Sequence, residues 1–195
     1  ATSAASRAPA YIDINARTDI TGDGHIDIDT DSHIFVEETL GDLRVGEIRS
    51  QFDSVELLSP GSILDAAPND LVGDSNADVI GNNITMTAQS GGIGTDFNFL
   101  EIDSSYSLAT GVLLADATDN IRVEETNGDL QVMRVTSSGG DVTLATVSGS
   151  ILDGNPDCPF WYSPPYCLFQ RAAMRKLNAC WIPIARMEAP APWIP

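Results

Sequence analysis

Residues 1–154 of this 195-residue chain contain no cysteine, no lysine and no tryptophan, and their only histidines are His25 and His33. Without cysteine, this part of the chain can form neither disulfides nor thiolate metal sites. It also lacks GxSxG, HExxH and glycine-rich phosphate-binding motifs, so no familiar set of nucleophile, base and metal ligand is present. These absences predict a protein that is not an enzyme.

Long apolar runs are absent as well. No stretch approaches the ~20 apolar residues of a membrane-spanning helix, and neither a signal peptide nor an initiator methionine opens the chain. We therefore expect no membrane insertion, and we take the chain to be a fragment of a longer protein.

Basic residues are scarce: 10 Lys and Arg face 28 Asp and Glu, for a formal net charge of −18. A surplus of this sign repels phosphate groups, so nucleic acid and anionic membranes are not the expected partners. The acidic surface should instead attract cations.

What the chain does contain is an internal repeat. Residues 121–153 largely repeat residues 34–65 in a frame of about 87 residues, and such a repeat indicates the architecture before any local pattern does. The matching segments include the Glu-Glu-Thr triplets at 37–39 and 124–126, the Gly-Asp-Leu triplets at 41–43 and 128–130, and the Gly-Ser-Ile-Leu-Asp runs at 61–65 and 149–153.

Each copy also shows a shorter rhythm. The runs at 55–59, 84–88 and 142–146 alternate apolar and polar residues, and each is followed by a small polar turn with glycine and then isoleucine. This pattern predicts short strands joined by tight turns, in coils of about 20 residues stacked as a parallel β-helix of about six coils. The inward positions are predicted to be Val36, Leu43, Val45, Leu57, Ile63, Ile84, Met86, Ile121, Val123, Leu130, Val132, Val142, Leu144 and Ile151.

Several submotifs resemble a known class of repeats. They are VEETLGDLRV and VEETNGDLQV, SSGGDVTLAT, GSILDA and GSILDG, and ADVIGNNITMTAQSGGIGT followed by NFLEIDSS. In this order they resemble the repeat arrays of very large bacterial secreted and surface proteins, the filamentous-haemagglutinin-like exoproteins or adhesins. The resemblance covers residues 27–154. It implies a right-handed parallel β-helix outside the cell and transfers no catalytic residue.

Two details concern aromatic residues. Phe52 stands where the second copy has Gly139, which predicts a wider turn in the first copy. The densest aromatic cluster of the body is predicted to fill the core, and it comprises Phe97, Phe99, Leu100 and Ile102.

One segment has the spacing of calcium ligands. Asp19, Asp23 and Asp27 fall at positions 1, 5 and 9 of a twelve-residue calcium loop, with Gly24 at position 6 and Asp29 close behind. Positions 3 and 12 are threonines, so the usual bidentate carboxylate is missing. The segment is therefore either a calcium site or a solvated acidic hairpin turn.

Other carboxylates are predicted to be structural. Glu37-Glu38 recurs as Glu124-Glu125, and neighbours on a strand point to opposite faces, so these pairs would not converge on one substrate. We expect one Glu of each pair to be solvated and the other to accept backbone N–H bonds in the following turn. Residues 68–83 are predicted to form a solvated loop that carries Asp70, Asp74 and Asp78.

The composition changes at residue 155. All three cysteines, all three tryptophans, the only lysine and 8 of the 11 prolines lie in residues 155–195. Proline removes ladder donors, so this tail cannot continue the solenoid, and an irregular structure is predicted. The tail is either a cap or translated sequence unrelated to the repeat.

The chain thus divides into an acidic N-terminal segment with a partial coil (1–26), a repeat region (27–154, with repeats at 34–66 and 121–154) and the tail (155–195). The favoured function is a structural or adhesive stalk of a secreted or cell-surface bacterial protein, which contacts a host cell, a neighbouring cell or a polysaccharide. The alternatives are a calcium-binding extracellular matrix module and, behind it, a polysaccharide-degrading β-helix enzyme.

Overall fold

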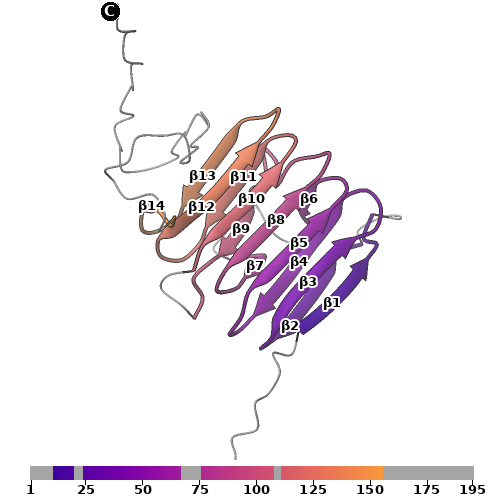
Figure 1. Ribbon diagram of the computed structural model, residues 1–195, viewed down its shortest axis with the longest axis horizontal. Helices are drawn as coiled ribbons and strands as arrows, with labels where there is room; N and C mark the ends of the chain where they lie inside the picture. Colours follow the sequence, from indigo (N-terminus) through magenta and orange to yellow (C-terminus); the bar gives the residue numbers. More distant parts are fainter. Residues whose placement is uncertain (1–10, 20–23, 67–75, 108–110, 156–195) are drawn as a thin grey trace, which may run out of the picture.

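A computed structural model of the protein describes residues 11–19, 24–66, 76–107 and 111–155. Within these ranges the chain is all β, and its parallel strands stack into a β-solenoid of about six turns (Figure 1). The parallel β-helix predicted from the alternating runs is therefore confirmed. No helix in the described ranges is long and apolar enough to cross a membrane.

Two seven-stranded parallel sheets form the walls of the solenoid. The first sheet contains, in spatial order, β1 (Tyr11–Ala16), β3 (His33–Glu38), β5 (Val55–Ser59), β8 (Ile84–Ala88), β10 (Leu113–Ala117), β12 (Leu130–Ser137) and β14 (Ile151–Asp153). The second contains β2 (Ile26–Thr30), β4 (Leu43–Ser50), β7 (Val79–Ile80), β9 (Leu100–Asp103), β11 (Ile121–Glu125) and β13 (Val142–Thr146), with β6 (Ile63–Asp65) also paired to β4. The described solenoid thus begins at Tyr11, within the segment predicted to hold a partial coil.

The strand partners give the length of a coil. Ile34 pairs with Val55 in the first copy and Leu130 with Ile151 in the second, so one turn takes about 21 residues in both copies. Between them, Val55 pairs with Ile84, about 29 residues on, because a segment of 13 residues, here called the excursion, separates β6 from β7. At ~4.8 Å per strand, the seven strands of one sheet span ~29 Å.

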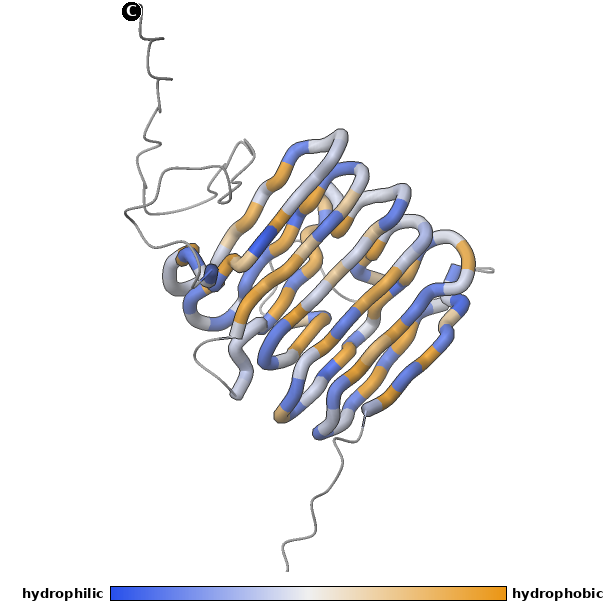
Figure 2. Tube along the Cα trace, in the orientation of Figure 1, coloured by the Kyte–Doolittle hydropathy of each residue, from blue (hydrophilic) through white to orange (hydrophobic). Residues whose placement is uncertain are grey.

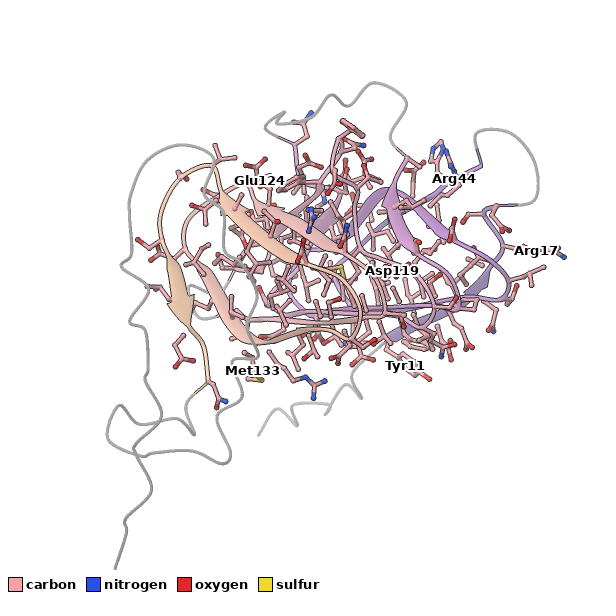
Figure 3. All side chains as sticks on the ribbon, turned by 90° about the horizontal axis from the view of Figure 1, so that it is seen from above. Tyr11, Arg17, Arg44, Asp119, Glu124 and Met133 are labelled. Atoms are coloured by element: carbon pink, nitrogen blue, oxygen red, sulfur yellow. The ribbon has the colours of Figure 1, made fainter. Side chains whose placement is uncertain are left out.

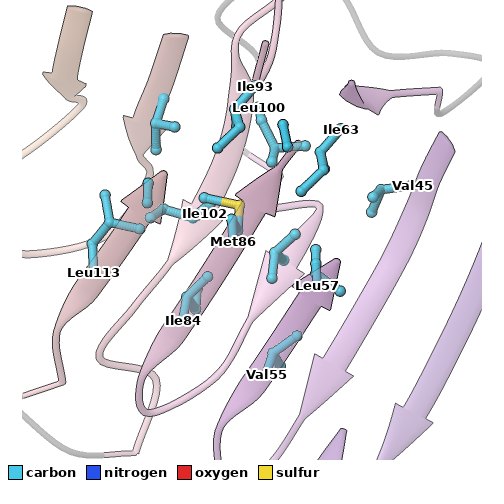
Figure 4. Packing of buried hydrophobic residues seen from close by; sticks show 14 of the residues in the cluster. Val45, Val55, Leu57, Ile63, Ile84, Met86, Ile93, Leu100, Ile102 and Leu113 are labelled. Carbon is cyan, nitrogen blue, oxygen red and sulfur yellow. The ribbon is translucent and has the colours of Figure 1, made fainter. Parts of the chain in front are cut away.

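Apolar side chains fill the space between the sheets. Along the strands hydrophobic and hydrophilic residues alternate (Figure 2), and the hydrophobic ones meet in one continuous core (Figure 4). Of the fourteen predicted inward residues, thirteen are buried, and Ile151 in the last coil is half-buried against the core. Phe97 corrects the aromatic prediction, because its side chain is 84% exposed whereas Phe99, Leu100 and Ile102 are buried.

The Glu-Thr pair of each repeat binds the preceding coil. In the first copy Glu38 is 1% exposed, and its Oε2 accepts bonds from the N–H (2.7 Å) and hydroxyl (2.8 Å) of Thr18. In the second copy Glu125 is fully buried and accepts the same two donors from Ser104, at 3.1 and 2.6 Å. The threonine that follows each glutamate donates its hydroxyl to a carbonyl of the same preceding coil.

In the first copy, these bonds and those of the following turn confirm the glutamate prediction. Glu38 also accepts the backbone N–H groups of Thr39 and Leu40 in the turn that follows it, whereas Glu37 is half-exposed. Glutamates 38 and 125 lie inward at the ends of their strands, so neither is available to a substrate.

The Gly-Asp pair of each repeat binds the following coil. Asp42 accepts the N–H of Ser62 at 2.7 Å, and Asp129 accepts the N–H of Ser150 at the same distance. The preceding glycines have positive φ, 80° at Gly41 and 79° in the second copy, which favours glycine over residues with a Cβ. We call the five-residue segments 38–42 and 125–129 the inter-coil staples, because each joins three successive turns.

The two copies lie on opposite sheets. The first copy begins on β3 of the first sheet, and the second begins on β11 of the second sheet. From β3 the chain returns to the first sheet three times, at β5, β8 and β10, before it reaches β11 on the opposite sheet (Figure 1). The later strands of the two copies also lie on opposite sheets: β4, β5 and β6 of the first copy correspond to β12, β13 and β14 of the second. The repeat unit therefore spans about three and a half turns.

Phe52 does not widen the turn after β4. Four residues separate β4 from β5, and four separate β12 from β13. Both turns are closed by the same bond, from the N–H of Asp53 to Ser50 Oγ at 3.0 Å and from the N–H of Gly140 to Ser137 Oγ at 2.8 Å. Phe52 is accommodated because its side chain is 66% exposed. The prediction of a wider turn is wrong.

The tail predicted at 155–195 lies outside the described residues after Asn155, as do Asp70 and Asp74 of the predicted loop. The choice between a cap and unrelated sequence therefore stays open.

Candidate cation site

Three carboxylates meet beside the excursion that follows β6. Asp65 is the last residue of β6, Asp78 directly precedes β7, and Glu101 lies in β9 of the next turn. One carboxylate oxygen from each residue lies within 4.8 Å of those of the other two. We call this group the acidic cluster. Among the described residues it is the group of His, Cys, Asp and Glu side chains that converges closely enough to hold a metal ion.

The acidic cluster is sheltered from solvent. Asp78 and Glu101 are each 2% exposed, and Asp65 is half-exposed. Glu101 alternates with the inward residues Leu100 and Ile102, yet all four residues of β9 are buried. The outer face of the second sheet is therefore covered at this point.

Hydrogen bonds fix Asp78 but leave Glu101 without donors. Asp78 Oδ2 accepts the N–H of Glu101 at 3.0 Å, and the N–H of Asp78 donates to the carbonyl of Glu101 at 2.8 Å. Neither carboxylate oxygen of Glu101 accepts a bond, and Asn98 Oδ1 is likewise buried without a partner. The side-chain N–H of Asn98 donates to Asp65, which places its amide beside the cluster. The side chain of Asp78 lies within hydrogen-bonding reach of Glu101, so a proton on Asp78 would give Glu101 a donor.

The electrostatics of the cluster are unfavourable for three bare charges. Burial raises the pKa of Asp78, and the charge of Asp65 raises it further. Burial likewise raises the pKa of Glu101. Glu124, the ladder partner of Glu101 on β11, also has a raised pKa because of burial, and Figure 3 shows it on the side of the second sheet. Like charges that lie directly opposite on neighbouring strands destabilise a sheet.

Sequence reasoning missed this cluster. Asp78 was placed in a solvated loop, and its burial makes that prediction wrong for this residue. Asp65 and Glu101 were not singled out: Glu101 has the outward parity of an ordinary surface residue, and Asp65 is the last residue of a short strand. The recurrence of Asp65 as Asp153 gave no signal either, because the described residues of the second copy form no such cluster and Asp153 is exposed.

The residues of the predicted calcium loop are placed differently. Asp27 accepts the N–H of Glu47 and lies 3.2 Å from His25 Nε2, and Asp29 pairs with Arg49 at 2.5 Å. The bond to Arg49 lowers the pKa of Asp29.

Asp19 lies over Gly41, so close that its carboxylate would collide with a Cβ there. Asp23 lies outside the described residues, so calcium binding by Asp19, Asp23, Asp27 and Asp29 stays a prediction.

Comparison with known proteins identifies no relatives: no protein family profile, no curated protein and no solved structure matches this chain. The fold and the contacts of its residues therefore carry the functional argument.

Two kinds of chemistry are open to paired carboxylates with raised pKa values. One is general acid catalysis, which requires contact with a substrate. The other is binding of a hard cation by oxygen ligands, which requires only room for the ion. At 2% exposure, Asp78 and Glu101 are too deeply buried to contact a polymer chain.

Proposed function

We propose that this chain is a non-enzymatic structural segment of a large secreted or cell-surface bacterial protein of the filamentous-haemagglutinin-like type, a β-helical stalk that presents its turns for attachment. The observation that carries the proposal is the inter-coil staple. The most strongly repeated polar residues of the sequence, at 38–39, 41–42 and their counterparts, hold one turn to the next. They are used to build a rod rather than a pocket.

One edge of the rod carries exposed aromatic side chains. Phe52 is 66% exposed and Tyr106 is 46% exposed, and both lie where strands of the second sheet turn into the first. The intervening turn links them, because Asn82 Nδ2 donates to the carbonyl of Phe52 at 2.8 Å and the N–H of Tyr106 donates to that of Gly81 at 3.4 Å. Exposed aromatic groups in such a row are typical of contact surfaces.

Binding of the fluorescently labelled chain to bacterial and animal cells and to a panel of neutral and acidic polysaccharides tests the attachment function. We expect binding to at least one of these surfaces, and a loss of at least about tenfold in the double variant Phe52→Ser, Tyr106→Ser. Phe97→Ser is the matched control, because Phe97 is more exposed but lies on a different turn. Failure to bind any of these surfaces would contradict the attachment function and leave only the stalk.

A calcium-binding matrix module is the second candidate function, favoured by the surplus of carboxylates. A polysaccharide-degrading enzyme is the third, and it predicts release of reducing ends or unsaturated products from at least one polysaccharide of the same panel. If the wild-type chain releases such products and the Asp78→Asn variant does not, the enzyme function would replace the stalk function as the better proposal.

A further inference from the structure

We propose that Asp65, Asp78 and Glu101 bind one divalent cation, best matched by calcium, at the base of the excursion between β6 and β7. The proposal goes beyond the stalk function and does not depend on it. Two independent observations support it. Three carboxylate oxygens converge within 4.8 Å, and both oxygens of the buried Glu101 lack a donor.

The dimensions of the cluster fit calcium. Calcium binds oxygen ligands at about 2.4 Å, so two ligands on opposite sides of the ion lie about 4.8 Å apart. The observed spread of the three oxygens is within this limit. Magnesium binds ligands at about 2.1 Å in strict octahedral geometry and usually keeps several waters, so a sheltered group of carboxylates suits it less well.

The chemistry of the surrounding groups fits as well. All available ligands are oxygens, which hard cations prefer, and no cysteine or histidine belongs to the cluster. Asn98 adds an amide oxygen that is buried without a partner next to Asp65. A cation would occupy the space that the like charges now share, and it would give Glu101 the partner it lacks.

The site would connect two turns across the excursion. Asp65 and Asp78 lie at the two ends of the excursion within one turn, whereas Glu101 belongs to the next. A bound ion would therefore join Asp65 to Asp78 and tie both to Glu101 of the following turn. Because the ion binds only when all three carboxylates are brought together, it should stabilise the folded chain selectively.

The competing explanation is a shared proton. If Asp78 stays protonated and donates to Glu101, the pair is satisfied without an ion. The two explanations differ in their response to calcium at neutral pH, where a cation displaces the proton and a proton-sharing pair alone shows no calcium dependence.

The test compares the melting temperature of the full chain in calcium and in a chelator, together with the stoichiometry of calcium binding by titration calorimetry. With calcium at about ten times its dissociation constant, we expect the melting temperature to rise by about 3–6 °C. Asp78→Asn and Glu101→Gln should abolish this rise and the corresponding binding event. Both variants should fold, because the new amide can donate to the remaining carboxylate.

Two controls locate the effect. Asp153→Asn alters the counterpart of Asp65 in the second copy, which is exposed and has no cluster, and it should leave the calcium response unchanged. Asp23→Asn alters the predicted calcium loop and should also leave it unchanged. The proposal would be overturned if the melting temperature of the wild-type chain were the same in calcium and in a chelator. It would also be overturned if calcium still raised the melting temperature of Asp78→Asn and Glu101→Gln.

Discussion

The two repeat copies use the same contacts on opposite walls of the solenoid. Glu38 and Glu125 each accept an N–H and a hydroxyl from the residue two places beyond their ladder partner, although β3 belongs to the first sheet and β11 to the second. The comparison shows that the repeat encodes how one turn binds the next, and not which sheet a strand joins. A flattened two-sheet solenoid permits this, because each sheet offers the same ladder to a parallel strand.

The copies differ in the surroundings of their last residue. Asp65 and Asp153 end the same Gly-Ser-Ile-Leu-Asp run, but Asp65 lies in the acidic cluster and Asp153 is exposed in the last described coil. The difference arises from the neighbouring turns, since the run itself is identical. Variants at matched positions can therefore separate what the repeat provides from what its surroundings add.

The largest expected effect comes from the core position of that run. Ile63 is fully buried, so Ile63→Ala should lower the free energy of unfolding by about 2–5 kcal/mol. Ile151→Ala, at the half-buried counterpart, should cost about 1 kcal/mol or less. Urea denaturation measures both values. Equal losses would mean that the last coil is covered as completely as the middle of the rod.

The inter-coil staples should contribute next. Glu38→Ala and Glu125→Ala each leave buried backbone and hydroxyl donors without an acceptor, and we expect each to cost about 1–3 kcal/mol. The two costs should agree within about 0.5 kcal/mol if the contacts are equivalent. Glu37→Ala is the control and should change stability by less than about 0.5 kcal/mol. A large cost in one copy and none in the other would contradict the equivalence of the two staples.

The alternation of the sequence predicted the interior well but could not predict the acidic cluster. Inward parity is a local property, so Ile63 and Ile121 were identified from period-2 runs and turn glycines alone. The burial of Glu101 cannot be derived from parity, because it depends on contacts with residues distant in the sequence, such as Asp78. Phe97 shows the converse, because its aromatic character predicted burial although its turn projects it outward.

A pH dependence should distinguish the second staple. Burial raises the pKa of Glu125 to about 7, even though the bonds from Ser104 act to lower it, while an ordinary glutamate titrates near 4.3. Between these values the folded chain holds a proton that the unfolded chain has released, so stability rises as the pH falls from about 7 toward 4.3. The gain from Glu125 should be about 1.5 kcal/mol between about pH 7 and pH 5.5.

Denaturant melts at several pH values, with a chelator present, measure this gain. Asp78 and Glu101 also have raised pKa values and act in the same direction, so the wild-type dependence should exceed that of Glu125 alone. In Glu125→Gln, the rise in the free energy of unfolding between about pH 7 and pH 5.5 should be smaller by the contribution of Glu125. An unchanged profile in this variant would show that Glu125 stays ionised throughout.

The smallest effect is expected at Phe52. Phe52→Gly gives the first copy the residue of the second at this turn, and the turn is closed by Ser50 in any case. The free energy of unfolding should change by less than about 0.5 kcal/mol. Gly139→Phe is the reciprocal variant and should be tolerated equally, as judged by urea denaturation. A loss above about 1 kcal/mol in either variant would mean that the two turns are not interchangeable.

The exchange of sheets between the copies has a geometric consequence for any longer array in the same frame. Each added unit of three and a half turns would rotate its loops by half a revolution, so successive units would face opposite directions. Loops with the same orientation would recur about every seven turns, or ~34 Å along the rod. If the rod serves the attachment function proposed above, a flat cell surface would contact only alternate units, and the remaining units would face away from it.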